Sequence, residues 1–283
     1  MIYFSKLKNI FLFSFLSLLI FINIDLSNNA EAKEITNIQW EKSVAKGKKL
    51  KKFRETVTSP ALGKKAWKIT LLPRDCGNDG GNYSDCQNNG KDAVVGHGGG
   101  DRARSEYSSK IRYTGEKWIS VSIYLPNDFK SVEPVSTSLF QIYEWGNTNQ
   151  QRHPRMMLRV ENGFLEPRYY PVNGRDVPGK IKKRLYIDDM RDKWTTIIFH
   201  TKMGKKAGEG FVKMYINDEL YNEYNGRTGY GGKFFNKFGI YHSWITRWNW
   251  NNQGYENYPT QVVYYDNLFR TNSKEKLLKL IKY

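Results

Sequence analysis

The segment Gly96–Tyr107 contains the residues whose spacing points most directly to chemistry. Its Arg102, Arg104 and Glu106 alternate with Ala, Ser and Tyr, so on an extended strand the three charged side chains would share one face. Two guanidinium groups beside a carboxylate that can orient them form a fork for a planar anion. The alternative is an ion-pair ladder on a solvated sheet face, and the segment by itself is compatible with both.

The segment Ser138–Trp145 offers a second set of polar and aromatic groups. On a strand, Gln141, Tyr143 and Trp145 would share one face, opposite two apolar residues. The glutamine amide can donate a neutral hydrogen bond, and the indole offers a plate for stacking. The alternative is a half-exposed strand with an amphipathic outer face.

The segment Lys233–Trp244 adds a phenol and an amine. On a regular strand Lys237, Gly239 and Tyr241 would share one face, and His242 would face the other way. A glycine inside a strand leaves room for a bulky ligand or for a closely approaching backbone. Lys237 beside Tyr241 would favour the phenolate electrostatically. The alternative is that Tyr241 is one of 19 ordinary tyrosines.

These side chains can share a face only if their segments form strands, and many other segments of the chain also show the alternation of apolar and polar residues that is typical of strands. Trp118–Leu125 alternates apolar and polar residues and ends at Pro-Asn-Asp. Met214–Tyr221 is typical of two strands joined by a turn at Asn217–Asp218. Further strands are predicted at Met156–Val160, Thr195–His200, Phe211–Ile216 and Val262–Tyr265.

Helical periodicity is found mainly at Ser273–Tyr283, a basic amphipathic tail. Many short strands separated by turn residues predict an all-β fold with two packed sheets. No repeat and no Pro- or Ser-rich linker divides the chain, so residues 33–283 are expected to form one domain.

Residues 1–32 have the pattern of a signal peptide. Lys6 and Lys8 precede the apolar run Ile10–Ile22, and Ala30-Glu31-Ala32 gives the small-x-small cleavage pattern. An uncleaved anchor is the alternative, but a run of 13 residues is short for a spanning helix. We therefore expect a secreted or periplasmic protein that keeps no transmembrane anchor after cleavage.

Export also bears on the two cysteines. Cys76 and Cys86 are ten residues apart in a stretch rich in Gly, Asn and Asp. In an oxidising compartment this predicts one disulfide that closes a surface loop. A metal site there is the weaker alternative, because no Cys-x-x-Cys spacing and no nearby histidine supports it.

The composition narrows the class of partner. A net charge of +17 indicates a polyanion, and export places it outside the cytoplasm, so a specific nucleic-acid partner is not expected. Two cysteines exclude a disulfide-dense scaffold, and four histidines leave little room for a multi-histidine metal centre. We expect a monomer that requires no cofactor. A structural Ca²⁺ would be compatible with such a sandwich, but no ligand cluster in the sequence indicates one.

Together, three motifs resemble those of the β-jelly-roll polysaccharide lyases, which include alginate, glucuronan and heparin lyases. The motifs are Arg104–Glu106, Gln141–Tyr143 and Lys237–Tyr241, in that order, and Tyr264–Arg270 is similar to the last core strand of the group. The resemblance covers roughly residues 101–270. It implies a concanavalin-like, two-sheet β-jelly-roll sandwich with a concave substrate groove.

The resemblance also implies roles for individual residues. Arg104 and Gln141 would neutralise a uronate carboxylate, and Tyr241 would serve as the acid and as one candidate for the base. Lys237 would line the same cleft. Alginate lyases usually have a histidine two residues after the glutamine, where this chain has Tyr143. His97, in the glycine-rich loop, is therefore the second candidate for the base. Substrate contacts are expected from Arg102, Tyr143, Trp145, Lys237 and Trp244.

The implied reaction is β-elimination on an acidic, uronate-containing polysaccharide such as alginate, glucuronan or a heparin-like polymer. One rival is a non-catalytic, lectin-like module that binds acidic glycans, which would not need Tyr241 near Arg104. A second rival is a glycoside hydrolase, which needs two carboxylates ~5–9 Å apart. The Glu-x-Asp-x-Glu strand common in hydrolases of this shape is missing from the sequence.

Overall fold

The computed structural model describes residues 33–34, 38–40, 54–72, 102–109, 111–172, 175–245, 247–248 and 257–283. At 33–34, 38–40, 54 and 172 it describes the backbone alone. The signal peptide (1–32), the Cys76–Cys86 disulfide and the candidate base His97 lie outside the described residues, so these three remain predictions.

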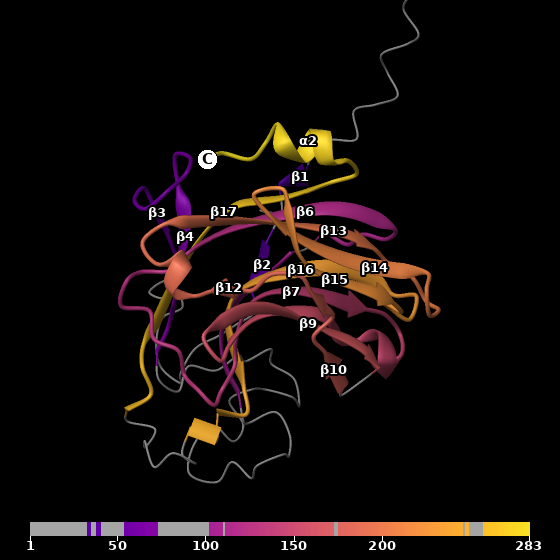
Figure 1. The fold of residues 1–283 in the computed structure, drawn as a ribbon, viewed down its shortest axis with the longest axis horizontal. Helices are drawn as coiled ribbons and strands as arrows, with labels where there is room; N and C mark the ends of the chain where they lie inside the picture. The colour runs from indigo at the N-terminus through magenta and orange to yellow at the C-terminus, as the bar shows by residue number, and fades with distance from the viewer. Residues whose placement is uncertain are drawn as a thin grey trace, which may run out of the picture.

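The described residues form two antiparallel sheets that lie one above the other (Figure 1). Within them, one sheet has nine strands. Eight run in the order β11 (Lys180–Ile181), β15 (Glu219–Gly226), β14 (Gly210–Ile216), β13 (Trp194–Lys202), β6 (Glu116–Tyr124), β17 (Gln261–Thr271), β4 (Ala66–Leu71) and β3 (Arg54–Val57), and β1 (Lys33–Glu34) pairs with β17.

The second sheet has eight strands within the same residues. Seven run in the order β10 (Arg175–Val177), β9 (Phe164–Val172), β8 (Pro154–Glu161), β7 (Thr137–Trp145), β16 (Lys233–Ser243), β5 (Arg102–Ser109) and β2 (Ile38–Trp40), and β12 (Leu185–Tyr186) pairs with β9. Two short 3₁₀ turns, Asn149–Gln151 and Asp188–Met190, lie between strands. The predicted all-β sandwich is confirmed.

Alternation along the strands builds the interior between the sheets. Ile119, Val121 and Ile123 of β6 are fully buried in the core. The intervening Ser120 faces the other side, where its hydroxyl donates to the carbonyl of Asn267 at 2.6 Å. Burial of each aliphatic side chain contributes about 2 kcal/mol, so the predicted two-residue period of this strand is what fixes its orientation.

The predicted turn at Asn217–Asp218 connects β14 to β15. The φ angles of Asn217 and Asp218 are 50° and 64°. Both residues thus occupy the left-handed region that a two-residue hairpin turn requires and that Asn and Asp tolerate better than other non-glycine residues.

The C-terminal helix is shorter than the sequence predicts. Helix α2 spans Lys274–Leu278 rather than the whole tail, and it lies on the outer face of the nine-stranded sheet (Figure 1). Ser273 caps its start by accepting a hydrogen bond from the amide of Lys276. The side chain of Asn267 binds both the amide and the carbonyl of Lys282, which holds the chain end against β17. No helix among the described residues is long and apolar enough to cross a membrane.

His242 faces the interior, on the opposite side of β16 from Tyr241, as the alternation predicts. Its Nε2 lies 2.7 Å from Gln261 Oε1, and its Nδ1 lies 2.5 Å from the Tyr258 hydroxyl. Gln261 Nε2 donates to the carbonyl of Lys130, so its Oε1 is the atom left to accept from His242. The imidazole is therefore neutral, with its proton on Nε2 and with Nδ1 accepting from Tyr258.

This buried histidine predicts a pH dependence of stability. Burial lowers the pKa of His242 from 6.5 to about 3. Between these two values the unfolded chain binds the proton and the folded chain does not, so the free energy of unfolding falls as the pH is lowered from about 6.5 towards 3. The loss is on the order of 4 kcal/mol over the window. Denaturant unfolding at several pH values should show this slope in the wild type and a shallower one in His242→Gln. Equal slopes in the two proteins would contradict the prediction.

Candidate active site

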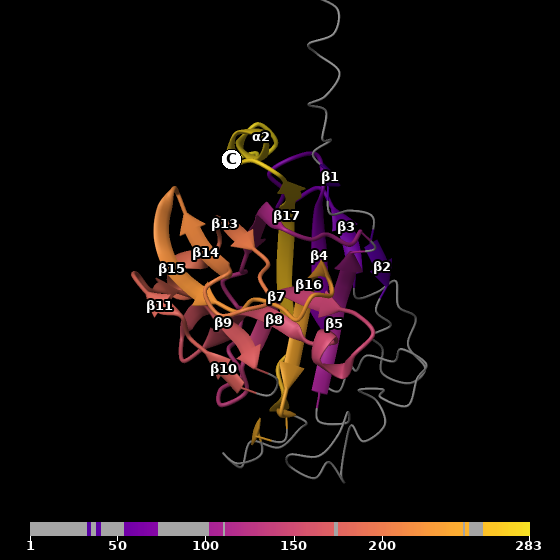
Figure 2. The same cartoon turned by 90° about the vertical axis from the view of Figure 1, so that its right-hand side faces the viewer.

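The three predicted motifs lie on three neighbouring strands. β16 is hydrogen-bonded to β7 on one side and to β5 on the other, and Figure 2 shows β5 and β16 side by side. In this register Tyr241 lies opposite Arg104, and Lys237 lies opposite Gln141. Residues that are 137 positions apart in the first pair and 96 in the second are thus direct neighbours.

A buried carboxylate joins two of these residues. Glu106 is fully inaccessible to solvent. Its Oε2 lies 3.2 Å from Arg104 Nη1, and its Oε1 accepts a hydrogen bond of 2.5 Å from Gln141 Nε2. The second N–H of the Gln141 amide is not used in this bond. One carboxylate therefore orients both a guanidinium and an amide that can donate to a further anion.

The phenol of Tyr241 lies next to this pair. The guanidinium carbon of Arg104 is 4.4 Å from the centre of the Tyr241 ring. Tyr241 is 6% exposed and Lys237 is 5% exposed, so both side chains are largely shielded from water. The structure therefore brings the guanidinium, the amide, the phenol and the amine together on one sheet.

Gly239 explains how β16 fits against β5. Its φ is +132°, and a Cβ added there would lie 2.3 Å from the carbonyl oxygen of Ser105. Of the two roles expected for this glycine, close approach of a backbone is thus the one observed. The Tyr265 hydroxyl donates to the carbonyls of Gly239 and Leu139, at 2.8 and 3.0 Å. Burial, with the nearby charge of Glu106, raises the pKa of Tyr265, which keeps the hydroxyl protonated as a donor.

Tyr143 occupies the position at which alginate lyases usually have a histidine. Its hydroxyl donates to the backbone carbonyl of Arg152 at 2.7 Å, and Lys237 Nζ lies 4.6 Å from the centre of its ring. The hydroxyl is thus held by the β7–β8 connection, while the ring forms part of the surface beside Lys237. This arrangement fits a positioning or substrate-contacting role.

The remaining predicted contact residues are more dispersed. Arg102 lies opposite Ser243 near one end of β16 and is partly exposed. Trp244 follows that end and is 38% exposed. Trp145 lies opposite Lys233 at the other end and is 47% exposed. The two tryptophans therefore flank the central residues from opposite ends of the strand.

The histidines in the described part of the chain lie away from the group formed by Arg104, Gln141 and Tyr241. His200 stacks on Trp118 in the nine-stranded sheet, and His242 is in the interior. His153 lies in the β7–β8 connection, where burial and then the positive charges of Arg155 and Arg102 lower its pKa.

Ion pairs lie farther along the same sheet, on β8, β9 and β10. Arg159 Nη1 lies 3.1 Å from Asp176, and Arg168 Nη2 lies 3.1 Å from Glu161. These pairs have the ladder arrangement weighed above as the alternative for the Arg102–Glu106 segment. In the described part of the chain, no group of three or more His, Cys, Asp and Glu residues could hold a metal ion.

The fold and the site point to a class of protein, since a β-sandwich here carries a guanidinium, an amide and a phenol that are chemically able to bind an anion and to transfer protons. A family model described as polysaccharide lyase matches residues 28–269, and the chain belongs to this family. It is a polysaccharide lyase, which favours that interpretation over the lectin-like module and the hydrolase. No curated protein matched the chain.

Solved structures share the fold at low sequence identity. An endo-β-1,4-glucuronan lyase from the fungus Trichoderma reesei is 16% identical, with a TM-score of 0.56 over 86% of this chain and 94% of that one. A family 7 alginate lyase, A1-II′, in complex with product is 12% identical, with a TM-score of 0.50 over 79% and 84%. The catalytic domain of a glycoside hydrolase family 131 protein from Coprinopsis cinerea is 11% identical, with a TM-score of 0.51 over 84% of both chains. The fold alone therefore does not separate lyases from hydrolases.

Proposed function

We propose that the protein is a secreted lyase that cuts a uronate-containing polysaccharide by β-elimination. The observation that carries the proposal is the contact of Arg104 and Gln141 with one buried carboxylate, with Tyr241 packed against the same arginine. The substrate class follows from these donors together with a net charge of +17. Secretion follows from the signal pattern in residues 1–32.

The chemical difficulty in this reaction is the weakly acidic proton at C5 of the uronate. Its removal builds negative charge on the sugar carboxylate, so donors aimed at that carboxylate lower the barrier. Arg104 and Gln141 are such donors, and Glu106 holds them in place before substrate arrives. Each donor is expected to contribute about 3 kcal/mol to transition-state stabilisation.

The second requirement is a pair of proton transfers. A base takes the C5 proton, the C4–O bond breaks as the C4–C5 double bond forms, and an acid gives a proton to the departing oxygen. Tyr241 is the acid in this proposal, and the base is either Tyr241 itself as phenolate or His97. The Arg104 guanidinium over the ring would stabilise negative charge on the phenol during the transfer.

The geometry around Glu106 does not suit hydrolysis. A hydrolase needs one carboxyl to protonate the leaving group and another to activate water or attack the sugar. Glu106 is fully buried and bound by Arg104 and Gln141, so it is not exposed to a sugar. A non-catalytic binding module does not need a proton donor, so it would not require a largely buried phenol beside Arg104.

The test is direct. The mature protein should be incubated with alginate, glucuronan, heparin and heparan sulfate, and the ultraviolet absorbance of the unsaturated uronate product should be followed. We expect a rise with at least one polymer, and the same rate after dialysis against EDTA, since no cofactor is proposed. Folded protein that gives no rise with any uronate polymer would refute the proposal.

A further inference from the structure

A second group of residues capable of binding an acidic sugar lies at the end of β7, away from Tyr241. Trp145, the last residue of that strand, is 47% exposed and so offers its indole ring to solvent. Arg112, Arg152 and Lys233 are exposed around it. These four residues are called the Trp145 cluster below.

The positive groups of the cluster face the indole. The guanidinium carbons of Arg152 and Arg112 lie 5.0 and 5.9 Å from the centre of the Trp145 ring. Lys233 lies directly opposite Trp145 on β16, a position from which side chains on one sheet face touch. Within the described residues, neither Arg152 nor Lys233 forms an ion pair with a carboxylate. The cluster therefore combines an exposed ring with several positive charges.

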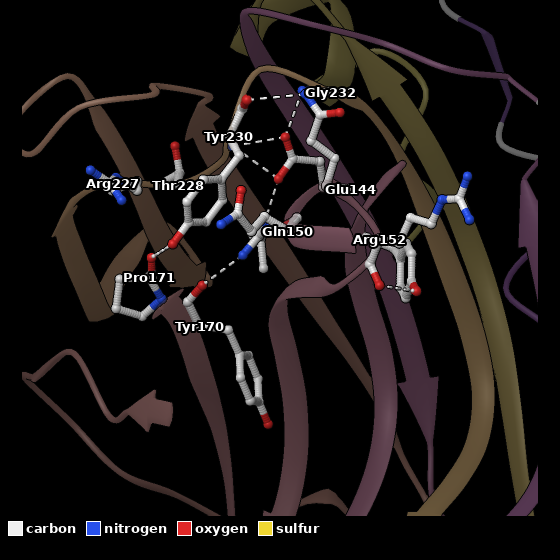
Figure 3. A network of polar contacts seen from close by, with 12 residues as sticks. Glu144, Gln150, Arg152, Tyr170, Pro171, Arg227, Thr228, Tyr230 and Gly232 are labelled. Carbon is white, nitrogen blue, oxygen red and sulfur yellow. Dashed lines mark hydrogen bonds and ion pairs between the residues drawn. The ribbon is translucent and has the colours of Figure 1, made fainter. Parts of the chain in front are cut away.

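The backbone beneath the cluster is held firmly. Glu144, the residue before Trp145, is fully buried and accepts hydrogen bonds from the amides of Tyr230 and Gly232 (Figure 3). It also forms a buried ion pair of 2.7 Å with Arg155, which in turn donates to the carbonyls of Tyr170 and Gln150. Breaking such a pair costs about 3–5 kcal/mol, so the end of β7 is fixed before a ligand binds.

Arg152 is oriented by the same connection. Its Nε donates to the carbonyl of Gly146 at 3.1 Å, and its own carbonyl accepts from the Tyr143 hydroxyl. Figure 3 shows its guanidinium directed away from the Glu144 network. Among the described residues no carboxylate pairs with its two terminal nitrogens, and guanidinium groups bind planar anions through two such nitrogens at once.

A chain of side-chain contacts connects the cluster to the proposed catalytic residues. Arg112 lies 3.8 Å over the Phe235 ring, and Phe235 contacts Tyr143 with ring centres 5.1 Å apart. Tyr143 in turn lies under Lys237. Trp145 is four residues beyond Gln141 on the same strand, a separation of about 13 Å. That is too far for one sugar residue to touch both groups.

We propose that the Trp145 cluster is a second binding subsite, which holds another acidic sugar residue of the polymer that is cut. The sugar ring lies on the exposed indole, and its carboxylate or sulfate is bound by Arg112 and Arg152. The inference rests on the proposed function. It adds that the enzyme gains affinity from chains long enough to span from Gln141 to Trp145.

The test compares substrate lengths. Using the polymer that the wild type cuts, kcat/KM is measured on a long oligosaccharide and on the shortest one that is still cut, for Trp145→Ala and Arg152→Ala. We expect each variant to lose roughly tenfold in kcat/KM on the long substrate, through KM, with less than twofold change on the short one. Arg152→Lys should lose less than Arg152→Ala, because it keeps the charge but not the fork.

Matched controls are Tyr283→Ala and Lys276→Ala, which remove an exposed ring and a charge at the C-terminal end, near α2. Both should behave as wild type on both lengths. An equal loss on long and short substrates, or no loss on either, would overturn the subsite. A wild type that cuts nothing would instead overturn the proposed function. A desulfated polymer separates the two anions, since loss of the length effect assigns sulfate and its persistence assigns carboxylate.

Discussion

Tyr241→Phe is expected to lower kcat by at least about 10³-fold while leaving affinity for the polymer within about threefold. In the proposed mechanism the substitution removes the proton that the departing C4 oxygen receives, but it keeps the ring that packs against Arg104. The measurement is steady-state product formation, together with equilibrium binding of an uncut polymer. Because the ring is retained, thermal unfolding should change little.

Tyr170→Phe is the matched control for this experiment. Tyr170 lies on β9 of the same sheet, and its hydroxyl lies 3.5 Å from Met157 Sδ. Its loss should leave kcat unchanged. His97→Asn then separates the two candidates for the base, since it should abolish turnover only if His97 takes the C5 proton. Normal turnover in Tyr241→Phe would show that Tyr241 is not the acid.

Glu106→Gln is expected to have the second largest effect, on both stability and rate. The change leaves the Arg104 guanidinium without its buried counter-charge, which should lower the free energy of unfolding by about 3 kcal/mol. It also frees Arg104 and Gln141 to leave their aligned positions, so kcat should fall by about 10²-fold. KM should stay the same or decrease, because the site becomes more positive.

This division between kcat and KM distinguishes a positioning role from general damage to the fold. Glu161→Gln serves as the control, since Glu161 pairs with Arg168 on the same sheet at a half-exposed position. It should cost less than about 1 kcal/mol and leave kcat unchanged. A Glu106→Gln protein with wild-type kcat would show that the buried carboxylate does not orient the donors.

Local patterns in the sequence predicted the strands and the faces of their side chains. The alternation in β6 and in Lys233–Ser243 reflects burial on one side, which acts on each strand separately. The adjacency of β5, β7 and β16 was inferred from a resemblance and not from any pattern, because strand order depends on contacts between distant segments. The structure supplies that order and the register that places Tyr241 opposite Arg104.

Other features of the site could not be predicted because they depend on that register. The sequence suggested Glu106 as a partner for arginine, but its bond to Gln141 requires β16 to separate their strands by the right distance. The contact of Gly239 with Ser105 and the tie between Tyr143 and Arg152 arise in the same way. The helix at the C-terminus was overestimated because its periodicity carries no information about the contact of Lys282 with Asn267.

The central strand of the site, β16, is synthesised long after the two strands that flank it. The two outer strands of the site, β5 and β7, are synthesised early, but the strand that lies between them comes from residues 233–243. Until that late segment inserts, Arg104 and Gln141 have no common neighbour, and the Tyr241 phenol is absent. If the proposed site is correct, a polypeptide truncated before β16 should not degrade polysaccharide, and activity should appear only when nearly the entire chain has been synthesised.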